Sequence, residues 1–500
     1  MTTNDAETIL EGLDDAQRAA ATALEGPVRI VAGAGAGKTR TVTRRIAYAC
    51  AKGKWRANRI LAVTFSVKAA DEMKQRLTKL GVGDEVTAAT FHSVALQQLR
   101  TVWYDISEAP LPHVVDDPQE IVARALKRAT NTDQYDGIAR RNVLAEINWA
   151  KVSLIAPGDY VRVCAATHRI PPAELDPQAF SEVYLAYEQE KTARGEMDFN
   201  DILLLDCHVL EAFDEQAAQI RQSIGWLTVD EYQDVSPLQH RLMQLWLGEN
   251  RNVCVVGDPA QTIYSFAGAS SYDLLHFSDE FGRLTADVNL NTDYRSVPQV
   301  VSAANQLLSA APDRDQYLRL VSARDKSAGM RVVKTAFEDD EQEAMGVAKR
   351  IAQFVAGGAK PSECAVLTRL NVQQQVVCKA LKELAIPYQT RRDMGSEGLV
   401  LQDENASRRE ALEILANRKE HGVTISSVHA SKGLEFKHVF IIGCSEGLLP
   451  YGSPAPGEAL EEERRLFYVA VTRAEDSLHL SYARSKDAGS AFARLPSRFW

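Results

Sequence analysis

The sequence lacks the features that mark membrane, secreted and disulfide-stabilised proteins. It contains no apolar run of about 18 residues, the length that a membrane-spanning helix needs. Its first residues, MTTND, do not resemble a secretory signal peptide. The seven cysteines are scattered and none belongs to a CxxC pair, which argues against a zinc ribbon or a disulfide framework. We therefore expect a protein of the reducing cytoplasm.

An excess of positive charge is also missing. The chain has 57 Lys and Arg against 67 Asp and Glu, a net charge of -10, which disfavours a generic nucleic-acid binder. The charge is uneven, because residues 38–79 carry twelve Lys and Arg against Asp71 and Glu72. A solvated helix face would explain this run as well as a nucleic-acid surface would. Charge alone therefore leaves the partner open.

Length and patterning predict an α/β protein of several domains. A chain of 500 residues exceeds what one hydrophobic core usually serves, so two to four domains or subdomains are expected. Short apolar runs alternate with segments of helical spacing, which predicts parallel sheets covered by helices on both faces. Residues 94–197 differ, since they have few β-branched runs and predict an inserted helical subdomain.

A loop of small residues near the N-terminus is the strongest local signal. It follows the apolar run 28–31 and opens a helical segment, and this order is typical of the phosphate-binding P-loop. Lys38 is predicted to reach the β- and γ-phosphates, and Thr39 to bind Mg²⁺. The strict pattern GxxxxGK[ST] has glycine first, where this chain has alanine, and a merely similar small-residue loop is the alternative. The predicted loop is Ala32, Gly33, Ala34, Gly35, Ala36, Gly37, Lys38 and Thr39.

Two later strand ends carry polar groups that suit nucleotide hydrolysis. The predicted strand 224–229 is followed at once by Asp230 and Glu231, where the first acid would hold Mg²⁺ and the second would deprotonate a water. Two acids after a strand are also common in turns, but the upstream P-loop strengthens the catalytic interpretation. After the strand 252–256, Gln261 is placed to sense a γ-phosphate.

Aromatic residues follow several of the predicted strands. Tyr264 and Phe266 offer flat faces on which nucleic-acid bases could stack. Phe65 and Phe91 each fall at the carboxyl end of a strand, where open α/β sheets bind ligands, although core packing explains either residue equally well. The second half of the chain has no P-loop of its own, and its predicted strands cover residues 330–337, 364–368, 423–428, 438–443 and 477–481.

Taken in order, these motifs resemble the UvrD/Rep-type DNA helicases of superfamily 1A, and most of all the actinobacterial members. The similarity begins at Gln17 and runs to the C-terminus. It is carried by AGAGAGKT, TFSVKAADEM, TFHS, VDEYQD, VVGDPAQTIYSFAGA, DYRS, VHASKGLEF and EEERRLFYVAVTRAED. The resemblance implies two RecA-like parallel-sheet domains, ATP and Mg²⁺ as cofactors, and single-stranded DNA and 3′-tailed duplex DNA as partners.

The resemblance also implies individual roles. Gln17 would read adenine, Arg40 would lie beside the base and Tyr294 would stack on it. Glu435 would bond the ribose, while Arg295 and Arg473 would reach the γ-phosphate from the second lobe as arginine fingers. The DNA track would consist of Thr64, Phe65, Phe91, His92, Tyr264 and Phe266.

Departures from the family pattern concern DNA rather than ATP. Phe266 stands where tryptophan is common, Ala267 where arginine is usual, and Val67 where asparagine is usual. The expected domain 1A comprises residues 1–93 and 198–290, subdomain 1B residues 94–197, and domain 2A residues 291–388 and 423–500. Only residues 389–422 remain for the family's 2B subdomain, so we expect a vestigial linker there and no C-terminal accessory domain.

The leading hypothesis is therefore an ATP-dependent 3′-to-5′ DNA translocase and helicase of repair, replication or recombination, associated with the nucleoid and compact enough for a phage. A protein partner could replace the missing 2B function. A nucleotide-dependent regulator that binds DNA without processive unwinding is the main alternative. A pseudoenzyme is disfavoured because the hydrolytic residues are present. A nuclease is disfavoured because the sequence displays no second carboxylate cluster at metal-site spacing.

Overall fold

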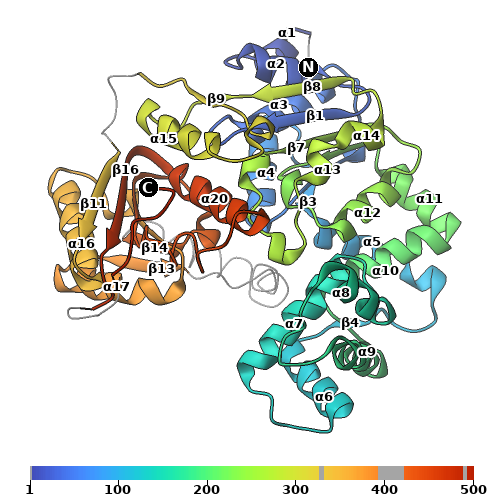
Figure 1. Cartoon of the computed structure of the whole chain (residues 1–500). Helices are drawn as coiled ribbons and strands as arrows, with labels where there is room; N and C mark the ends of the chain where they lie inside the picture. The colour runs from blue at the N-terminus through green and yellow to red at the C-terminus, as the bar shows by residue number, and fades with distance from the viewer. Residues whose placement is uncertain (1–2, 326–331, 392–421, 488–492) are drawn as a thin grey trace.

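Two six-stranded parallel sheets organise the chain, as Figure 1 shows. The computed structural model describes residues 3–325, 332–391, 422–487 and 493–500. Among these residues no helix has the length and apolar character needed to cross a membrane. The predicted α/β class with two parallel-sheet, RecA-like units is confirmed.

The first sheet has the strand order β3-β2-β6-β7-β1-β8, and all five pairings are parallel. Its strands are β1 (Val28–Ala32), β2 (Ile60–Thr64), β3 (Thr87–Thr90), β6 (Trp226–Val229), β7 (Val253–Gly257) and β8 (Ala286–Leu290). The helices of this lobe are α1 (Thr3–Ile9), α2 (Asp15–Thr22), α3 (Lys38–Ala51), α4 (Val67–Lys79), α5 (Phe91–Ile106), α10 (Phe199–Ala212), α11 (Asp214–Ser223), α12 (Pro237–Leu247), α13 (Tyr272–Leu275) and α14 (Phe277–Phe281).

The central strands of this sheet are buried on both faces. Every residue of β2 and β7 is buried, which is why both appear in the sequence as unbroken apolar runs rather than alternating ones. One face packs on α5, α10 and α12 and the other on α2, α3 and α4. Because all strands run the same way, their carboxyl ends meet at one edge, where such sheets bind ligands.

A helical insertion interrupts the first lobe between β3 and β6. It contains α6 (Pro118–Thr130), α7 (Gly137–Val152), α8 (Tyr160–Thr167) and α9 (Pro177–Arg194), which enclose a separate apolar core. The short strands β4 (His113–Val114) and β5 (Glu196–Met197) pair in parallel where the chain enters and leaves it. In Figure 1 this insertion, in teal, stands apart from the second sheet.

The second sheet has the order β11-β16-β15-β12-β14-β13, again with parallel pairings throughout. Its strands are β11 (Val333–Phe337), β12 (Cys364–Thr368), β13 (Tyr388–Arg391), β14 (Val423–Ser427), β15 (Phe436–Ile441) and β16 (Ala474–Ala483). The helices of this lobe are α15 (Pro298–Ser309), α16 (Asp340–Ala356), α17 (Gln374–Glu383) and α20 (Glu458–Val471).

The lobes are joined by a short connection and by a shared apolar cluster. Beyond β8, strands β9 (Thr292–Asp293) and β10 (Val321–Ser322) form a two-stranded parallel sheet between them. Ala34, Ala260 and Ile263 of the first lobe pack in the same core as α15 and α20 of the second. The division into domains stays a prediction, and most of the expected vestigial linker, residues 392–421, lies outside the described residues.

Candidate ATP site and DNA track

The P-loop turns sharply between the end of β1 and the start of α3. Gly35 and Gly37 have φ angles of 71° and 77°, in the left-handed region that side chains disfavour. Because α3 begins at Lys38, the loop lies at a helix N-terminus, whose N–H groups and partial positive charge attract anions. A Cβ at Gly35 would lie 2.1 Å from Oδ1 of Asp293, so glycine is required there. The loop fits a polyphosphate.

Two carboxylates follow β6 directly and lie beside the P-loop lysine. The Nζ atom of Lys38 is 3.3 Å from Oε1 of Glu231. The Thr39 hydroxyl donates to Oδ2 of Asp230 across 3.5 Å. Glu231 has a φ of 54°, a left-handed conformation that costs a residue with a Cβ about 1–3 kcal/mol. Such strain is common where a catalytic side chain must be aimed, and here it turns the carboxylate toward Lys38.

The two acids have opposite electrostatic environments. Burial raises the pKa of Asp230 to about 7, and the neighbouring Glu231 adds to this shift. Burial also opposes ionisation of Glu231, but Lys38 and Lys432 outweigh it and lower its pKa to about 2. Glu231 is therefore ionised, the form that a proton acceptor must have. Lys38 opposes the shift of Asp230 without cancelling it, and the Asp230 carboxylate with the Thr39 hydroxyl forms the oxygen donor set that Mg²⁺ prefers.

The second lobe contributes a guanidinium to this site. Arg473 follows α20, is 2% exposed, and donates to the backbone oxygens of Val469 and Leu434 across 3.0 and 3.1 Å. Its NH2 group lies 3.4 Å from Oε1 of Gln261, whose own amide nitrogen donates to Asp258 across 2.7 Å. Residues from the two sheets therefore meet at one point, next to the P-loop and the paired acids.

Arg295 lies in the same cationic region but is held differently. Burial and the positive charge of Arg295 together lower the pKa of Arg473 to about 10. Two guanidinium groups that repel one another favour an anion between them. Nε of Arg295 is 2.5 Å from Oε2 of Glu435, the residue expected to bond a ribose. In this arrangement Glu435 serves as the ion-pair partner of Arg295, and its ribose contact stays a prediction.

The residues expected around the base lie close to the P-loop. Gln17 is 1% exposed, forms a capping box with Asp14, and donates to a P-loop backbone oxygen across 2.9 Å. Gly37 lies close to both Gln17 and Arg40. A Cβ at Gly37 would lie 3.0 Å from the side-chain amide nitrogen of Gln17 and 3.9 Å from Cβ of Arg40. Tyr294 is 42% exposed and its hydroxyl donates to Asp14. The structure thus gathers Gln17, Arg40 and Tyr294 at one edge.

An aromatic row runs along the carboxyl edge of the first sheet. The rings of Phe65 and Tyr264 stack with centroids 5.3 Å apart, and Tyr264 meets Phe266 edge-on at 5.9 Å. His429 of the second lobe extends the row, with its ring 5.8 Å from that of Phe266. Phe266 is 55% exposed and presents the freest face. Sequence reasoning missed His429, although it lies inside the VHASKGLEF motif.

Three other residues expected on the DNA track are placed differently. Phe91 is 2% exposed and stacks on Trp246, which favours the core-packing alternative, and its DNA contact stays a prediction. Thr64 is also covered, at 1% exposure. The His92 ring stacks on Phe199 with centroids 3.9 Å apart, and burial lowers its pKa to about 3. A DNA contact of His92 stays a prediction.

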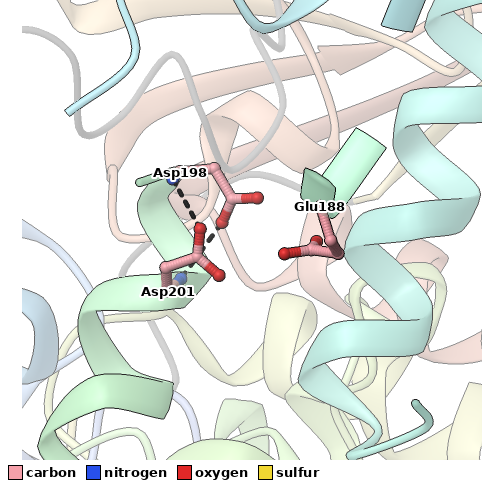
Figure 2. Close-up of side chains that lie close together, drawn as sticks. All are labelled: Glu188, Asp198 and Asp201. Carbon is pink, nitrogen blue, oxygen red and sulfur yellow. Dashed lines mark hydrogen bonds between the residues drawn. The ribbon is translucent and has the colours of Figure 1, made fainter. Parts of the chain in front are cut away.

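A carboxylate cluster lies at the junction of the helical insertion and the first lobe. Figure 2 shows Glu188 facing Asp198 and Asp201, close enough together to hold a metal ion. The three acids are not marked as a cluster by any spacing in the sequence. Two buried ammonium groups already neutralise it, because Lys151 and Lys191 each lie 2.6 Å from Asp198 and also pair with the other two acids. The cluster is therefore an ion-pair network that joins α7, α9 and α10.

Comparison with known families accounts for most of the chain. Residues 13–282 match the UvrD/REP helicase N-terminal domain. Residues 288–395 and 403–485 match the UvrD-like helicase C-terminal domain. The boundary between the two matches falls near β8, where the first sheet ends.

Individual relatives are similar along nearly the whole chain. The ATP-dependent DNA helicase UvrD2 of Mycobacterium tuberculosis is 38% identical, over 99% of this chain and 82% of the relative. The ATP-dependent DNA helicases PcrA of Leuconostoc citreum and of Staphylococcus aureus are 26% and 25% identical, over 99% and 98% of this chain and 85% and 86% of the relatives. The alignment to UvrD2 spans 578 positions and thus exceeds the 500 residues here, so that relative carries residues this chain lacks.

Proposed function

Since this chain belongs to the UvrD/REP helicase family, we propose that it couples ATP hydrolysis between two lobes to 3′-to-5′ movement on single-stranded DNA. It is an ATP-dependent DNA helicase by family, as its relatives UvrD2 and PcrA are named. Repair, replication or recombination is the setting that we propose. The polarity and the 3′-tailed duplex substrate rest on the family likeness.

The observation that carries this proposal is the meeting of Arg473 with Gln261 across the lobe boundary, at 3.4 Å. Because the P-loop and the guanidinium belong to different sheets, the complete site exists only when the lobes are together. Interactions that stabilise the transferring phosphoryl group therefore also favour closure, and their loss favours opening. Repeated closing and opening becomes movement when the lobes alternate their grip on DNA.

Each side chain then has a defined task. Lys38 and the N–H groups of the P-loop neutralise the β- and γ-phosphates, and Glu231 accepts a proton from the attacking water. Arg295 and Arg473 neutralise charge that develops on the transferred group. Thr39 and Asp230 would hold Mg²⁺, which supplies further neutralisation of the phosphate charge when bound.

For the DNA track we propose stacking of bases on Phe266 and the rings behind it, Tyr264, Phe65 and His429. Aromatic stacking tolerates any base, as expected of a motor that must pass every sequence. We also propose that 2B is reduced here. The longer alignment to UvrD2 supports this, and a protein partner would then supply contacts to the duplex.

The experiment is steady-state ATP hydrolysis with and without single-stranded DNA, with Lys38→Ala as the inactive control. A motor should be stimulated at least tenfold by DNA, and Lys38→Ala should abolish turnover. The alternative, a nucleotide-dependent DNA-binding regulator, would hydrolyse ATP slowly whatever DNA is present. Unstimulated turnover would therefore refute the motor proposal.

A further inference from the structure

Lys432 reaches from the second lobe into the first and has three partners there. It follows the 3₁₀ turn η10 (His429–Ser431) and is largely covered at the lobe boundary. Its ammonium pairs with the carboxylate of Asp234 and donates to the backbone oxygen of Gln261 across 2.7 Å. It also lies 5.1 Å from the centre of the Tyr264 ring, a cation–π contact.

These three partners belong to different parts of the site. Asp234 ends the turn η3 (Tyr232–Asp234), which begins directly after Glu231. Gln261 ends the turn η4 (Pro259–Gln261) and faces Arg473. Tyr264 belongs to the aromatic row. One ammonium of the second lobe therefore touches the hydrolytic segment, the γ-phosphate sensor and the proposed DNA track of the first.

The contacts on Lys432 are strong because they are shielded from water. The side chains of Lys432 and Asp234 are 10% and 1% exposed. Burial raises the pKa of Asp234 to about 6 even though Lys432 opposes the shift, so the carboxylate depends on this partner. The turn η10 makes a second contact with Tyr264, because the Tyr264 hydroxyl donates to the backbone oxygen of His429 across 3.3 Å. Separation of the lobes must break these contacts together.

We propose that Lys432 is the positioning residue that ties the hydrolytic state of Gln261 to the placement of Tyr264 on DNA. Its three contacts are with protein groups of the first lobe, and we expect it to act through them. This inference rests on the proposed function, because it concerns how that function's two sites communicate. Typical coupling free energies correspond to about 5–150-fold effects, so the contribution of one such residue is measurable.

The test compares Lys432→Met with the double variant Asp234→Asn/Lys432→Met. We measure the ratio of DNA-stimulated to basal ATP hydrolysis, and the change in single-stranded DNA affinity on adding a non-hydrolysable ATP analogue. Lys432→Met should lower the ratio of DNA-stimulated to basal ATP hydrolysis by roughly tenfold. It should also reduce the change in DNA affinity that the ATP analogue causes. It should also lower the melting temperature, because it leaves Asp234 buried and unpaired.

The double variant separates positioning from stability. It removes the carboxylate charge of Asp234, which Lys432→Met leaves without its cation. The melting temperature should therefore recover while the ratio of DNA-stimulated to basal hydrolysis stays low. Arg464→Met is the matched control, since Arg464 is equally buried at 10% but pairs with Glu461 inside the second lobe. It should lower stability and leave the ratio unchanged. Recovery of the ratio in the double variant, or an equal loss in Arg464→Met, would overturn the inference. Absence of stimulation in the unaltered protein would instead refute the proposed function.

Discussion

Replacement of Arg473 by alanine should abolish most ATP turnover while leaving ATP binding largely intact. The guanidinium enters from the second lobe, is anchored by two backbone oxygens, and lies 3.4 Å from Gln261 of the first lobe. Its other neighbour, Arg295, repels it, so the pair is arranged for an anion that arrives between them. Such an arrangement acts most strongly when negative charge is greatest, in the transition state.

The size of the effect follows from the role of arginine fingers. Such a residue supplies about 10³–10⁵ in rate, equivalent to roughly 4–7 kcal/mol of transition-state stabilisation. Because Arg295 would still supply one positive charge, we expect the lower end, a loss of about 10³ in kcat. The two backbone oxygens that lose their donor add a stability cost of about 1–3 kcal/mol. KM for ATP should change less than tenfold, since the P-loop is untouched.

The assay is steady-state ATP hydrolysis at saturating single-stranded DNA, together with equilibrium binding of a fluorescent ATP analogue. Arg473→Lys keeps the charge but loses the planar fork, and it should recover only part of the rate. Thermal unfolding of each variant shows that the comparison is made on folded protein. A kcat within tenfold of the unaltered enzyme would refute the idea that the two lobes share one hydrolytic site.

Four further substitutions test the DNA track, the base edge and a buried acid. Phe266→Ala should weaken single-stranded DNA binding by roughly 1–3 kcal/mol in a fluorescence titration, whereas Phe91→Leu should lower the melting temperature and leave affinity unchanged. Tyr294→Phe removes the hydroxyl that bonds Asp14 but keeps the ring, so KM for ATP should rise about threefold with kcat constant. Burial raises the pKa of Glu343 from 4.5 to about 7. Stability is therefore lost as pH rises through this interval, and Glu343→Gln should be up to about 3 kcal/mol more stable than the unaltered protein at pH 8 but not at pH 4 in denaturant titrations. A DNA affinity of Phe266→Ala equal to that of the unaltered protein would contradict the stacking role. An unchanged KM in Tyr294→Phe would contradict the role of the hydroxyl, and a stability difference independent of pH in Glu343→Gln would contradict the raised pKa.

The sequence was sufficient to predict most strands of both sheets and the glycine-rich loop between β1 and α3. Buried parallel strands such as β7 need an unbroken apolar run, and that run can be seen without a structure. The edge strand β8 was missed, because its ADVNL sequence alternates between partly exposed and exposed residues before the final buried Leu290. Local patterning identifies a strand most readily where both of its faces are covered.

The contacts within the site were harder to predict. Phe91 and Phe65 occupy equivalent places after their strands, yet only Phe91 is fully covered, because Trp246 of a distant helix packs on it. Lys432 and Asp234 are 198 residues apart, and nothing local marks either one as the partner of the other. Such pairings depend on how the two lobes are placed, and a single sequence does not encode that placement in any local pattern.

The most direct test of coupled movement is strand displacement on duplexes with a 3′ tail, a 5′ tail or no tail, under single-turnover conditions with ATP and Mg²⁺. We expect ATP-dependent separation of the 3′-tailed duplex alone, and none with Lys38→Ala. Separation that needs no ATP, or that proceeds equally from either tail, would contradict coupled movement.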